Sequence, residues 1–477
     1  MMPVASSSTL HSELLTAPSL SSDYIVPSRT DDKCGSDVKY NADYVLKNKE
    51  KTYTQQYAGL YFLRLAVLKP RAVKAASEAW DGMAILNQEV KRVDRVLDVK
   101  QGEFCWAVGT VYMEMLLKPN ILDEITKEFW TTVPISSDKI ADSEHDSIML
   151  EDESGRLNLT GAALKQELLV TGCVIAVLGS ETTDGDFDVI DVRYPDLAPQ
   201  IARPITQEPT SRQGKYIALI SGLEISGDVY ESYETTMLME YLMGELGGSK
   251  DAIAAANIMH VILAGNTFGD SETKSEDRTK AKKKYGYDSG AYNVTPTATV
   301  DSMLADLCAS VAVDLMPGDS DPTNLSLPQQ AITPALVPRA REFSKSTFKS
   351  VTNPHWWDCD GVRILGTAGQ PIDDIFKYVD GDDRLRMMEY TLRWQHCAPT
   401  APDTLWSYPF QDHDPFVLSE CPHVYFAGNQ PSFSTKTIEG RDGQCVCLIT
   451  VPKFASTGEI VLLDVDSLQC KVVKFKK

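Results

Sequence analysis

Residues 311–330 read VAVDLMPGDSDPTNLSLPQQ, and this stretch decides how the rest of the chain is interpreted. Val311, Val313 and Leu315 alternate with smaller or polar residues before a Pro-Gly pair breaks the pattern. The pattern predicts a buried strand that runs into a loop. Open α/β sheets place their sites in loops at the carboxyl ends of strands. The loop that follows, Gly-Asp-Ser-Asp over residues 318–321, is therefore a candidate site.

Length, charge and cysteine content limit the class of protein. The chain has 477 residues, of which 43% are apolar and 24% are charged, which suits two globular domains with tails. A formal net charge of −21 argues against a broad nucleic-acid-binding face, because phosphate neutralisation needs clustered Lys and Arg. Contact with DNA is therefore expected to be weak or made through partners. Ten cysteines without a CxxC pair predict neither a zinc ribbon nor a disulfide framework. Without a signal peptide or a membrane-spanning run, we expect an intracellular, reduced protein.

The amino-terminal region divides in two. Residues 1–46 are rich in Ser, Thr and Asp and are expected to form a disordered tail. Residues 47–85 are expected to form a helical segment, in which Pro70 ends or kinks the first helix and a second short helical piece leads to Trp80. The apolar stripe of the first helix consists of Tyr53, Tyr57, Leu60, Tyr61 and Leu65.

Residues 86–205 show the periodicity of short strands. Strands are predicted at 103–115, 147–151, 155–160, 171–180 and 186–194, separated by turn signals. Five strands in about a hundred residues suit a small closed barrel such as the OB-fold. An OB-fold that binds single strands uses a basic groove with exposed aromatic residues. This segment is acidic instead, so a protein-binding barrel is favoured. Its carboxylates include Glu151, Asp152, Glu153, Glu181, Asp184, Asp186, Asp188 and Asp191.

In residues 206–477, strands and helices alternate after a proline-rich linker. Helices are predicted at 230–246, 299–310, 372–378 and 384–394, and strands at 216–220, 261–264, 311–315, 362–365, 424–427, 445–451 and 460–465. This order predicts a mixed sheet or a two-sheet sandwich covered by helices. The insertion at 274–284 contains KAKKK, which suits a solvated loop or a nuclear-import signal.

The ends of the predicted strands can be compared with a two-metal phosphoesterase. Such an enzyme needs Asp, His and Asn ligands from several strand ends, so that two cations can polarise a phosphate and activate water. Its first strand ends in Asp-x-His, whereas this chain has Gly222 and Glu224. Its second ends in Gly-Asp, whereas this chain has Asn266. A neutral amide there removes the charge of a bridging carboxylate.

The remaining ligand positions are altered as well. Gly-Asn-His-Asp or Gly-Asn-His-Glu is expected after the third strand, where this chain has Asp319, Ser320 and Asp321. Gly-His-x-His is expected after the last, where Asn429 and Pro431 stand. A single weak cation site remains conceivable from Glu224, Asp319, Asp321 and His396. We therefore expect no catalytic residue, no functional metal and no cofactor.

Several sequence blocks, taken in order, resemble the family of small accessory subunits of replicative DNA polymerases, of the delta type. In the barrel region these are LEDESGRLNLTG and LVTGCVIAVLGS. In the second region they are HVILAGN, VDLMPGDSDPTNLSLPQQ, GVRILGTAGQPIDDIFKY, DPFVLSECPHVYFAGNQPSF and LITVPKF. The resemblance extends from about residue 53 to the carboxyl end.

The resemblance implies an OB-fold joined to a calcineurin-like phosphoesterase domain whose active site is lost. Archaeal members of the family keep the metal ligands and are nucleases, whereas this chain departs from them at the positions named above. The resemblance also implies a nuclear, noncatalytic subunit. It would bind the cysteine-rich carboxyl-terminal module of the catalytic subunit and a third subunit, contact the sliding clamp only indirectly, and bind no membrane. Two alternatives remain: a metal-dependent phosphodiesterase or 3′–5′ nuclease with degenerate ligands, and an OB-type single-strand binder.

Overall fold

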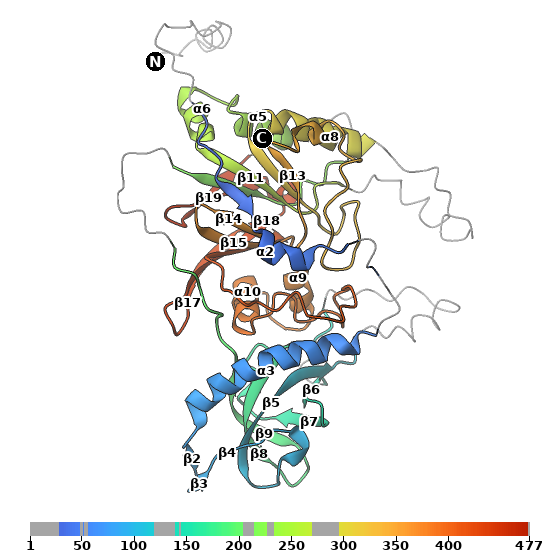
Figure 1. Ribbon diagram of the computed structural model, residues 1–477, viewed down its shortest axis with the longest axis vertical. Coiled ribbons are helices and arrows are strands. Elements are labelled where there is room, and N and C mark those ends of the chain that lie inside the picture. Colours follow the sequence, from blue (N-terminus) through green and yellow to red (C-terminus); the bar gives the residue numbers. More distant parts are fainter. Residues whose placement is uncertain are drawn as a thin grey trace, which may run out of the picture.

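A computed structural model describes residues 28–47, 51, 56–118, 139–142, 145–203, 214–226, 233–269 and 295–475. A barrel forms one end of the molecule and a two-sheet sandwich forms the other, with helices at both outer faces of the sandwich (Figure 1). Within these residues, no helix combines the length and the apolar character needed to cross a bilayer.

The predicted five-stranded barrel is confirmed. Strand β5 pairs with both β6 and β8, and the remaining pairings close the order β5–β6–β7–β9–β8–β5. Alternate residues such as Val111, Leu150, Ile175 and Phe187 fill its interior. The strands are β5 (Phe104–Glu114), β6 (Ser147–Glu151), β7 (Arg156–Thr160), β8 (Val174–Glu181) and β9 (Phe187–Arg193), preceded by the short β2 (Ala84–Ile85), β3 (Gln88–Glu89) and β4 (Lys91–Arg92).

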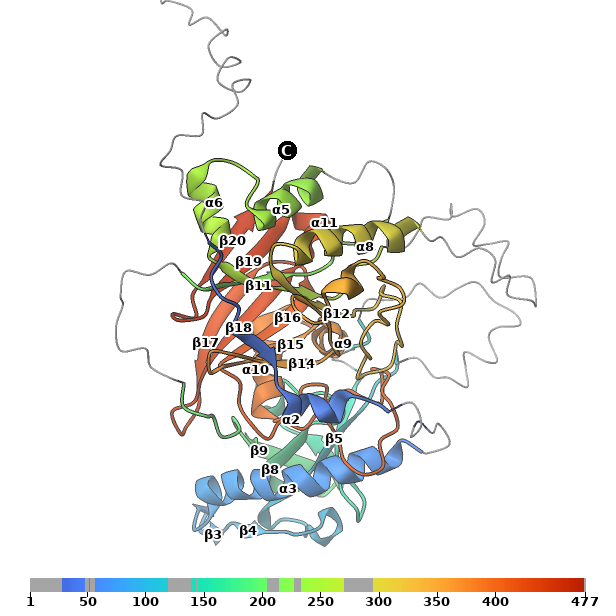
Figure 2. The same cartoon turned by 45° about the horizontal axis from the view of Figure 1, so that its top comes forward.

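One long helix, α3 (Ala58–Trp80), replaces the two helical pieces predicted around Pro70. The helix lies across the barrel (Figure 2), where its face from Leu65 to Trp80 packs on Trp106 and Leu178. An interior proline costs a helix about 3 kcal/mol. Burial of several large side chains outweighs that cost at roughly 25 cal/mol per Å². Residues 52–55, including Tyr53, lie outside the described residues.

The expected disordered tail is wrong for residues 28–46. Residues 28–47, here called the amino-terminal strap, run along the sandwich and form β1 (Cys34–Ser36) and α2 (Val38–Asn41). Strand β1 pairs with β14 (His355–Cys359), and Arg29 donates hydrogen bonds to the carbonyl oxygens of Leu242, Ala255 and Ile258. These long-range contacts order a segment whose own composition is polar. Residues 1–27 lie outside the described residues.

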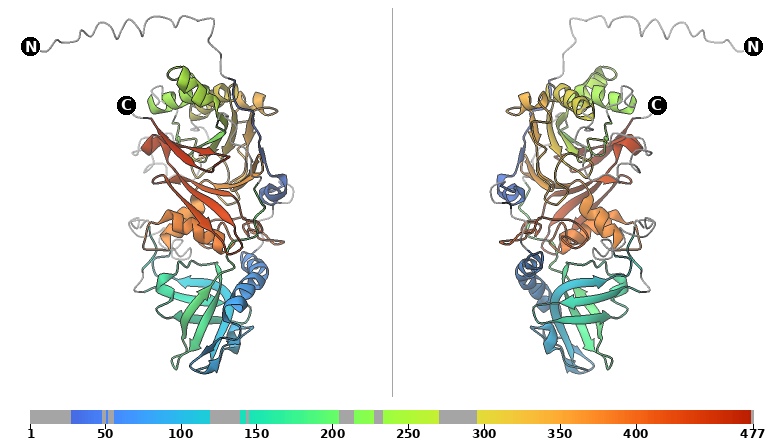
Figure 3. Two further views of the ribbon diagram at one scale, coloured as in Figure 1. Left: turned by 90° about the vertical axis from the view of Figure 1, so that its left-hand side faces the viewer. Right: turned by 90° about the vertical axis from the view of Figure 1, so that its right-hand side faces the viewer.

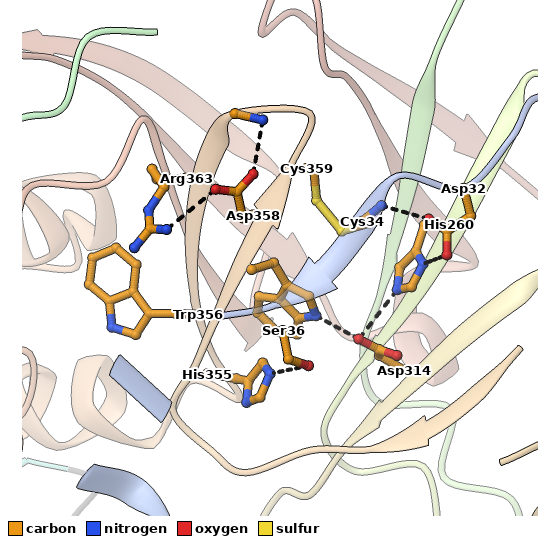
Figure 4. Close-up of a disulfide and its surroundings, with 12 residues drawn as sticks. Asp32, Cys34, Ser36, His260, Asp314, His355, Trp356, Asp358, Cys359 and Arg363 are labelled. Carbon is orange, nitrogen blue, oxygen red and sulfur yellow. Dashed lines mark hydrogen bonds and ion pairs between the residues drawn. A yellow bond between two sulfur atoms is a disulfide. The ribbon is translucent and has the colours of Figure 1, made fainter. Parts of the chain in front are cut away.

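The strap also carries a disulfide that the sequence did not predict. Cys34 and Cys359 stand opposite each other in the β1–β14 pair and are bonded (Figure 4). The expectation of a fully reduced chain therefore does not describe this pair. Strand register supplied the proximity, since 325 residues separate the two cysteines in sequence.

Two six-stranded sheets form the sandwich, which confirms the two-sheet prediction. Sheet I has the order β1, β14, β15 (Val362–Thr367), β16 (Val424–Gln430), β18 (Cys445–Pro452) and β17 (Ser434–Glu439). Sheet II has the order β13 (Phe348–Ser350), β12 (Ala312–Met316), β11 (Ile258–Ala264), β10 (Tyr216–Ile220), β19 (Glu459–Asp464) and β20 (Cys470–Lys474). The organising stretch thus forms β12, inside sheet II.

Helices cover the outer face of each sheet, as Figure 3 shows in side view, and the central strands of both sheets are buried. Ile262 and Met316 of sheet II meet Trp357 and Phe426 of sheet I between the sheets. The outer face of sheet II is covered by α5 (Tyr233–Met243) and α8 (Thr295–Cys308), with α6 (Ser249–Ala256) beside α5. The outer face of sheet I is covered by α9 (Gln370–Lys377) and α10 (Arg384–Arg393). The same hydrophobic cluster continues into the barrel, so barrel and sandwich share one core. The insertion at 274–284 lies outside the described residues.

Candidate functional site

The loops after β10, β11, β12 and β16 meet at one place, as the parallel pairing of β10, β11 and β12 requires. A Cβ atom added to Gly265 would lie 3.1 Å from Cα of Gly318 and 3.2 Å from Nδ2 of Asn429. A Cβ atom on Gly222 would lie 2.8 Å from Oδ1 of Asn429. The structure therefore brings together the candidate positions Gly222, Asn266, 318–321 and Asn429 from four strand ends.

The backbone at these strand ends adopts left-handed conformations. The φ angle is +48° at Glu224, +54° at Asn266 and +55° at Asn429, and the glycines at 222 and 265 have φ of +63° and +85°. Such conformations cluster at functional sites, and asparagine tolerates them better than most residues. Asn266 and Asn429 thus combine a left-handed backbone with a neutral side chain.

Asn266 and Ser320 use their side chains to hold loops together. Oδ1 of Asn266 accepts a hydrogen bond from the backbone N–H of Ser320 at 3.2 Å. The Ser320 hydroxyl donates to the carbonyl oxygen of Phe268 at 2.6 Å. Both positions named as altered metal ligands therefore serve contacts between the loops after β11 and β12.

Asp321 is buried and has the same kind of role. Its Oδ1 accepts from the backbone N–H of Phe268 at 2.9 Å, and its Oδ2 accepts from that of Gly318 at 2.7 Å. Burial raises the pKa of Asp321 to about 6, although the backbone donors oppose that change. With both oxygens engaged inside the protein, Asp321 stabilises the loop rather than facing a ligand.

Asn429 and Lys453 occupy the space between the two sheets at this edge. Nδ2 of Asn429 donates to the carbonyl oxygens of Ala368 at 2.8 Å and Ala264 at 3.3 Å. The Lys453 ammonium lies 2.5 Å from Oε1 of Glu224. The side chains of this ion pair are about one-third exposed, at 36% for Lys453 and 32% for Glu224.

Lys453 was not identified as a site residue from the sequence. It is the first residue after β18, and Ser221, the first residue after β10, forms a bridge with it. Its position just after β18, which the sequence predicts as a strand at 445–451, is the signal from which it could have been identified. Its ammonium group places a positive charge beside Glu224, which disfavours the binding of a cation by that carboxylate.

A network of side-chain amides links Asp319 to the interior. Nε2 of Gln370 donates to Oδ1 of Asp319 at 3.2 Å and to Oε1 of Gln329 at 2.9 Å. Nδ2 of Asn353 donates to Oε1 of Gln370 at 2.9 Å and to Oε1 of Gln329 at 2.8 Å. Asp319 itself is exposed at the rim. These three amides were not identified from the sequence, because no charged pattern marks them.

His396 and Pro431 do not join this arrangement as ligands. Nε2 of His396 lies 2.9 Å from Oδ2 of Asp414, which also accepts from Nε of Arg64 at 2.8 Å. Arg64 belongs to α3, so this cluster lies where the barrel helix meets the sandwich. Burial and the Arg64 charge lower the pKa of His396 to about 4, in spite of Asp414. Pro431 is exposed directly after β16 and has no ligating side-chain atom.

The site thus offers amides, backbone donors and one ammonium group where a two-metal centre needs converging carboxylate and imidazole ligands. In the part of the chain that the structure describes, no three His, Cys, Asp or Glu side chains are grouped so that they could hold a metal ion. The arrangement is suited chemically to fixing the loops and the two sheets against each other.

Comparisons with known proteins agree on a family. Residues 217–435 match the family of the B subunits of DNA polymerases alpha and epsilon, and residues 56–192 match the DNA polymerase delta subunit OB-fold domain. The chain is 40% identical over 427 residues to the DNA polymerase delta small subunit of Arabidopsis thaliana, covering 90% of this chain and 92% of the relative. It is 35% identical over 492 residues to that of Saccharomyces cerevisiae, covering 96% and 97%.

An archaeal relative is more distant. The DNA polymerase II small subunit of Archaeoglobus fulgidus is 23% identical over 302 residues, which cover 61% of this chain and 57% of the relative.

Proposed function

The chain belongs to the family of DNA polymerase delta small subunits, which are accessory subunits of that polymerase, and we propose that it acts there as a noncatalytic scaffold. The observation that carries the proposal is that the side chains at the converged strand ends are engaged in contacts within the protein. Asn266 and Asn429 make structural hydrogen bonds, Asp321 is buried on backbone donors, and Glu224 is paired with Lys453. The sandwich is, in this proposal, a calcineurin-like phosphoesterase domain that no longer hydrolyses phosphate esters and needs no cofactor.

We assign residues 86–205 to the OB-fold and residues 206–477 to the inactive phosphoesterase domain.

The proposed partners are the cysteine-rich carboxyl-terminal module of the catalytic subunit and the third subunit, and the complex acts in the nucleus. The chain would reach the sliding clamp only indirectly, through these partners. A net charge of −21 suits basic partner segments and disfavours a phosphate backbone.

Complex formation tests the scaffold directly. The full chain is mixed at micromolar concentration with the carboxyl-terminal module of the catalytic subunit and analysed by sedimentation velocity. A one-to-one complex is expected, and raising the salt concentration should weaken it because screening reduces the attraction between oppositely charged surfaces. Two species that sediment independently would contradict the proposal.

Nuclease assays on the same preparation separate this function from hydrolysis. The wild type and Asp319→Ala should both leave single-stranded DNA intact in the presence of Mn²⁺, and both should form the complex. Manganese-dependent cleavage that disappears in Asp319→Ala would favour a degenerate nuclease. Tight binding of single-stranded DNA with a steep salt dependence would favour a strand-binding barrel.

A further inference from the structure

Two free cysteines meet at the corner where one end of sheet I crosses sheet II. Cys447 lies on β18 with its side chain between the sheets, and Cys470 begins β20 and packs against the same cluster. The Cys447 thiol donates to the carbonyl oxygen of Leu468, two residues before Cys470, at 3.5 Å. The hydroxyl of Thr435 on β17 lies 3.6 Å from Sγ of Cys447. Three strands thus bring two thiols and one hydroxyl together.

The surroundings favour one thiolate shared by the pair. Hydrogen bonding from Cys470 and Thr435 lowers the pKa of Cys447 to about 7, although burial opposes this change. The loss of a second proton is correspondingly disfavoured, and the pKa of Cys470 is raised by Cys447 and by burial. A thiolate is the nucleophile in disulfide exchange. Cys470 is partly exposed and Cys447 is buried, so a reagent reaches the pair through Cys470, which becomes the attacking thiolate when its proton passes to Sγ of Cys447.

We propose that Cys447 and Cys470 form a redox-active pair, which a low-molecular-weight disulfide oxidises to a second intrachain disulfide. One cysteine thiolate attacks a sulfur of the small disulfide, whose S–S bond breaks and releases one small thiolate. The other cysteine then attacks the mixed disulfide, forms the Cys447–Cys470 bond and expels the second small thiolate. The two cysteines lose two electrons and two protons, and the small disulfide becomes two small thiols. The new bond fixes the β19–β20 hairpin to sheet I.

Peptide mapping tests this pairing on the full chain. The protein is incubated with glutathione disulfide at pH 7.4, its remaining thiols are alkylated, and it is cleaved with trypsin. Cleavage after Arg441, Lys453 and Lys471 releases Cys447 and Cys470 on separate peptides, so their bond appears as one cross-linked mass. The cross-linked mass should be the main product at Cys470, because the neighbouring thiol displaces glutathione from the mixed disulfide.

Cys445 shares a tryptic peptide with Cys447 and is the matched control. The cross-link should persist in Cys445→Ser and disappear in both Cys447→Ser and Cys470→Ser. Position 470 is partly exposed, so the serine there should not disturb folding. Loss of the cross-link in Cys445→Ser would overturn the assignment by placing the reaction on the exposed thiol. Glutathione adducts without any cross-link would overturn the pairing itself.

Discussion

The ammonium group of Lys453 lies 2.5 Å from the carboxylate of Glu224, and its Cγ lies 2.5 Å from the place where a Cβ on Gly222 would stand. One lysine therefore neutralises the carboxylate that remains at the end of β10 and fills the space beside it. An aspartate at position 222 would need that space, and a dication near Glu224 would meet a positive charge at close range. The inactive character proposed for the site has this steric and electrostatic basis.

Restoring two ligands is not expected to restore a metal centre. The double variant Asn266→Asp/Asn429→His adds one carboxylate and one imidazole, while Gly222 still supplies no ligand and Lys453 stays in place. We expect its affinity for Mn²⁺, measured by titration calorimetry, to stay within about threefold of the wild-type value, because the missing negative charge is not replaced. Stoichiometric Mn²⁺ binding by the double variant but not by the wild type would contradict this expectation, because Asn266 and Asn429 alone would then account for the lack of metal binding.

His260 predicts a pH dependence of stability. Its ring nitrogens lie 3.2 Å from Asp32 of the strap and 3.4 Å from Asp314 of β12 (Figure 4). Asp314 also accepts a hydrogen bond from Nε1 of Trp357 at 2.7 Å. Burial by itself lowers the pKa of His260, but the two carboxylates raise it from 6.5 to about 9. Because the pKa is higher in the folded state, the protonated His260 ring stabilises the folded protein. This contribution is complete below pH 6.5 and is lost as the pH rises towards 9.

The variant Asp32→Asn tests this dependence, because it removes one charge and keeps an acceptor for the backbone N–H of Cys34. We expect it to lower the free energy of unfolding by about 1 kcal/mol at pH 6.5 and by much less at pH 9.5, allowing for the partial exposure of Asp32. Denaturant titrations at both pH values measure the difference, with Asp31→Asn as the exposed neighbouring control. A difference that grows with pH would contradict the charged state of His260.

Arg64 is expected to be important for the attachment of the barrel to the sandwich. The side chain is fully buried, and it donates to the carbonyl oxygens of Gly172 in the barrel, to those of Pro399 and Ala401 beyond α10, and to Asp414. Removing one partner of a buried ion pair leaves the other charge uncompensated, which costs about 3–5 kcal/mol. Arg64→Met should therefore lower the free energy of unfolding by about that amount.

The matched control is Lys74→Met on the same helix, whose ammonium is exposed and pairs only loosely with Glu78 at 3.9 Å. Its expected effect is below about 0.5 kcal/mol. A second readout is the imidazole of His396, whose pKa should rise in Arg64→Met because the nearby positive charge is gone and Asp414 remains. Histidine titration by NMR measures it, and an unchanged pKa would mean that Arg64 does not act on His396.

Strand ends and barrel strands were predictable because their signals are local. The buried runs around Leu315 and Ile262 alternate or are continuously apolar, and turn residues follow them. The convergence of Asn266, Asn429 and the loop at 318–321 then followed from the rule that parallel strands end at one edge. These features needed no knowledge of distant contacts.

The features that were missed depend on contacts between distant segments. The strap has a polar composition, and only its contacts to β14 and to the carbonyl groups around Ile258 order it. Pro70 signals a break in sequence, but packing on the barrel keeps α3 continuous. Edge strands such as β17, with its exposed Thr and Lys residues, lack an apolar alternation. The role of Lys453 depends on its ion pair with Glu224, a residue distant in sequence.

Leu315 offers the most direct test of the organising strand. Its side chain is completely buried between β12 and the helices that cover sheet II. Leu315→Ala removes three buried carbon atoms and leaves a cavity, which should lower the free energy of unfolding by about 2–5 kcal/mol. Leu325→Ala, ten residues further in a loop with 57% of the residue exposed, is the control and should change it by less than about 0.5 kcal/mol. Chemical denaturation measures both variants. If they were equally stable, the helices would not be closely packed on β12, and the loop at 318–321 would lose the rigid strand that positions it.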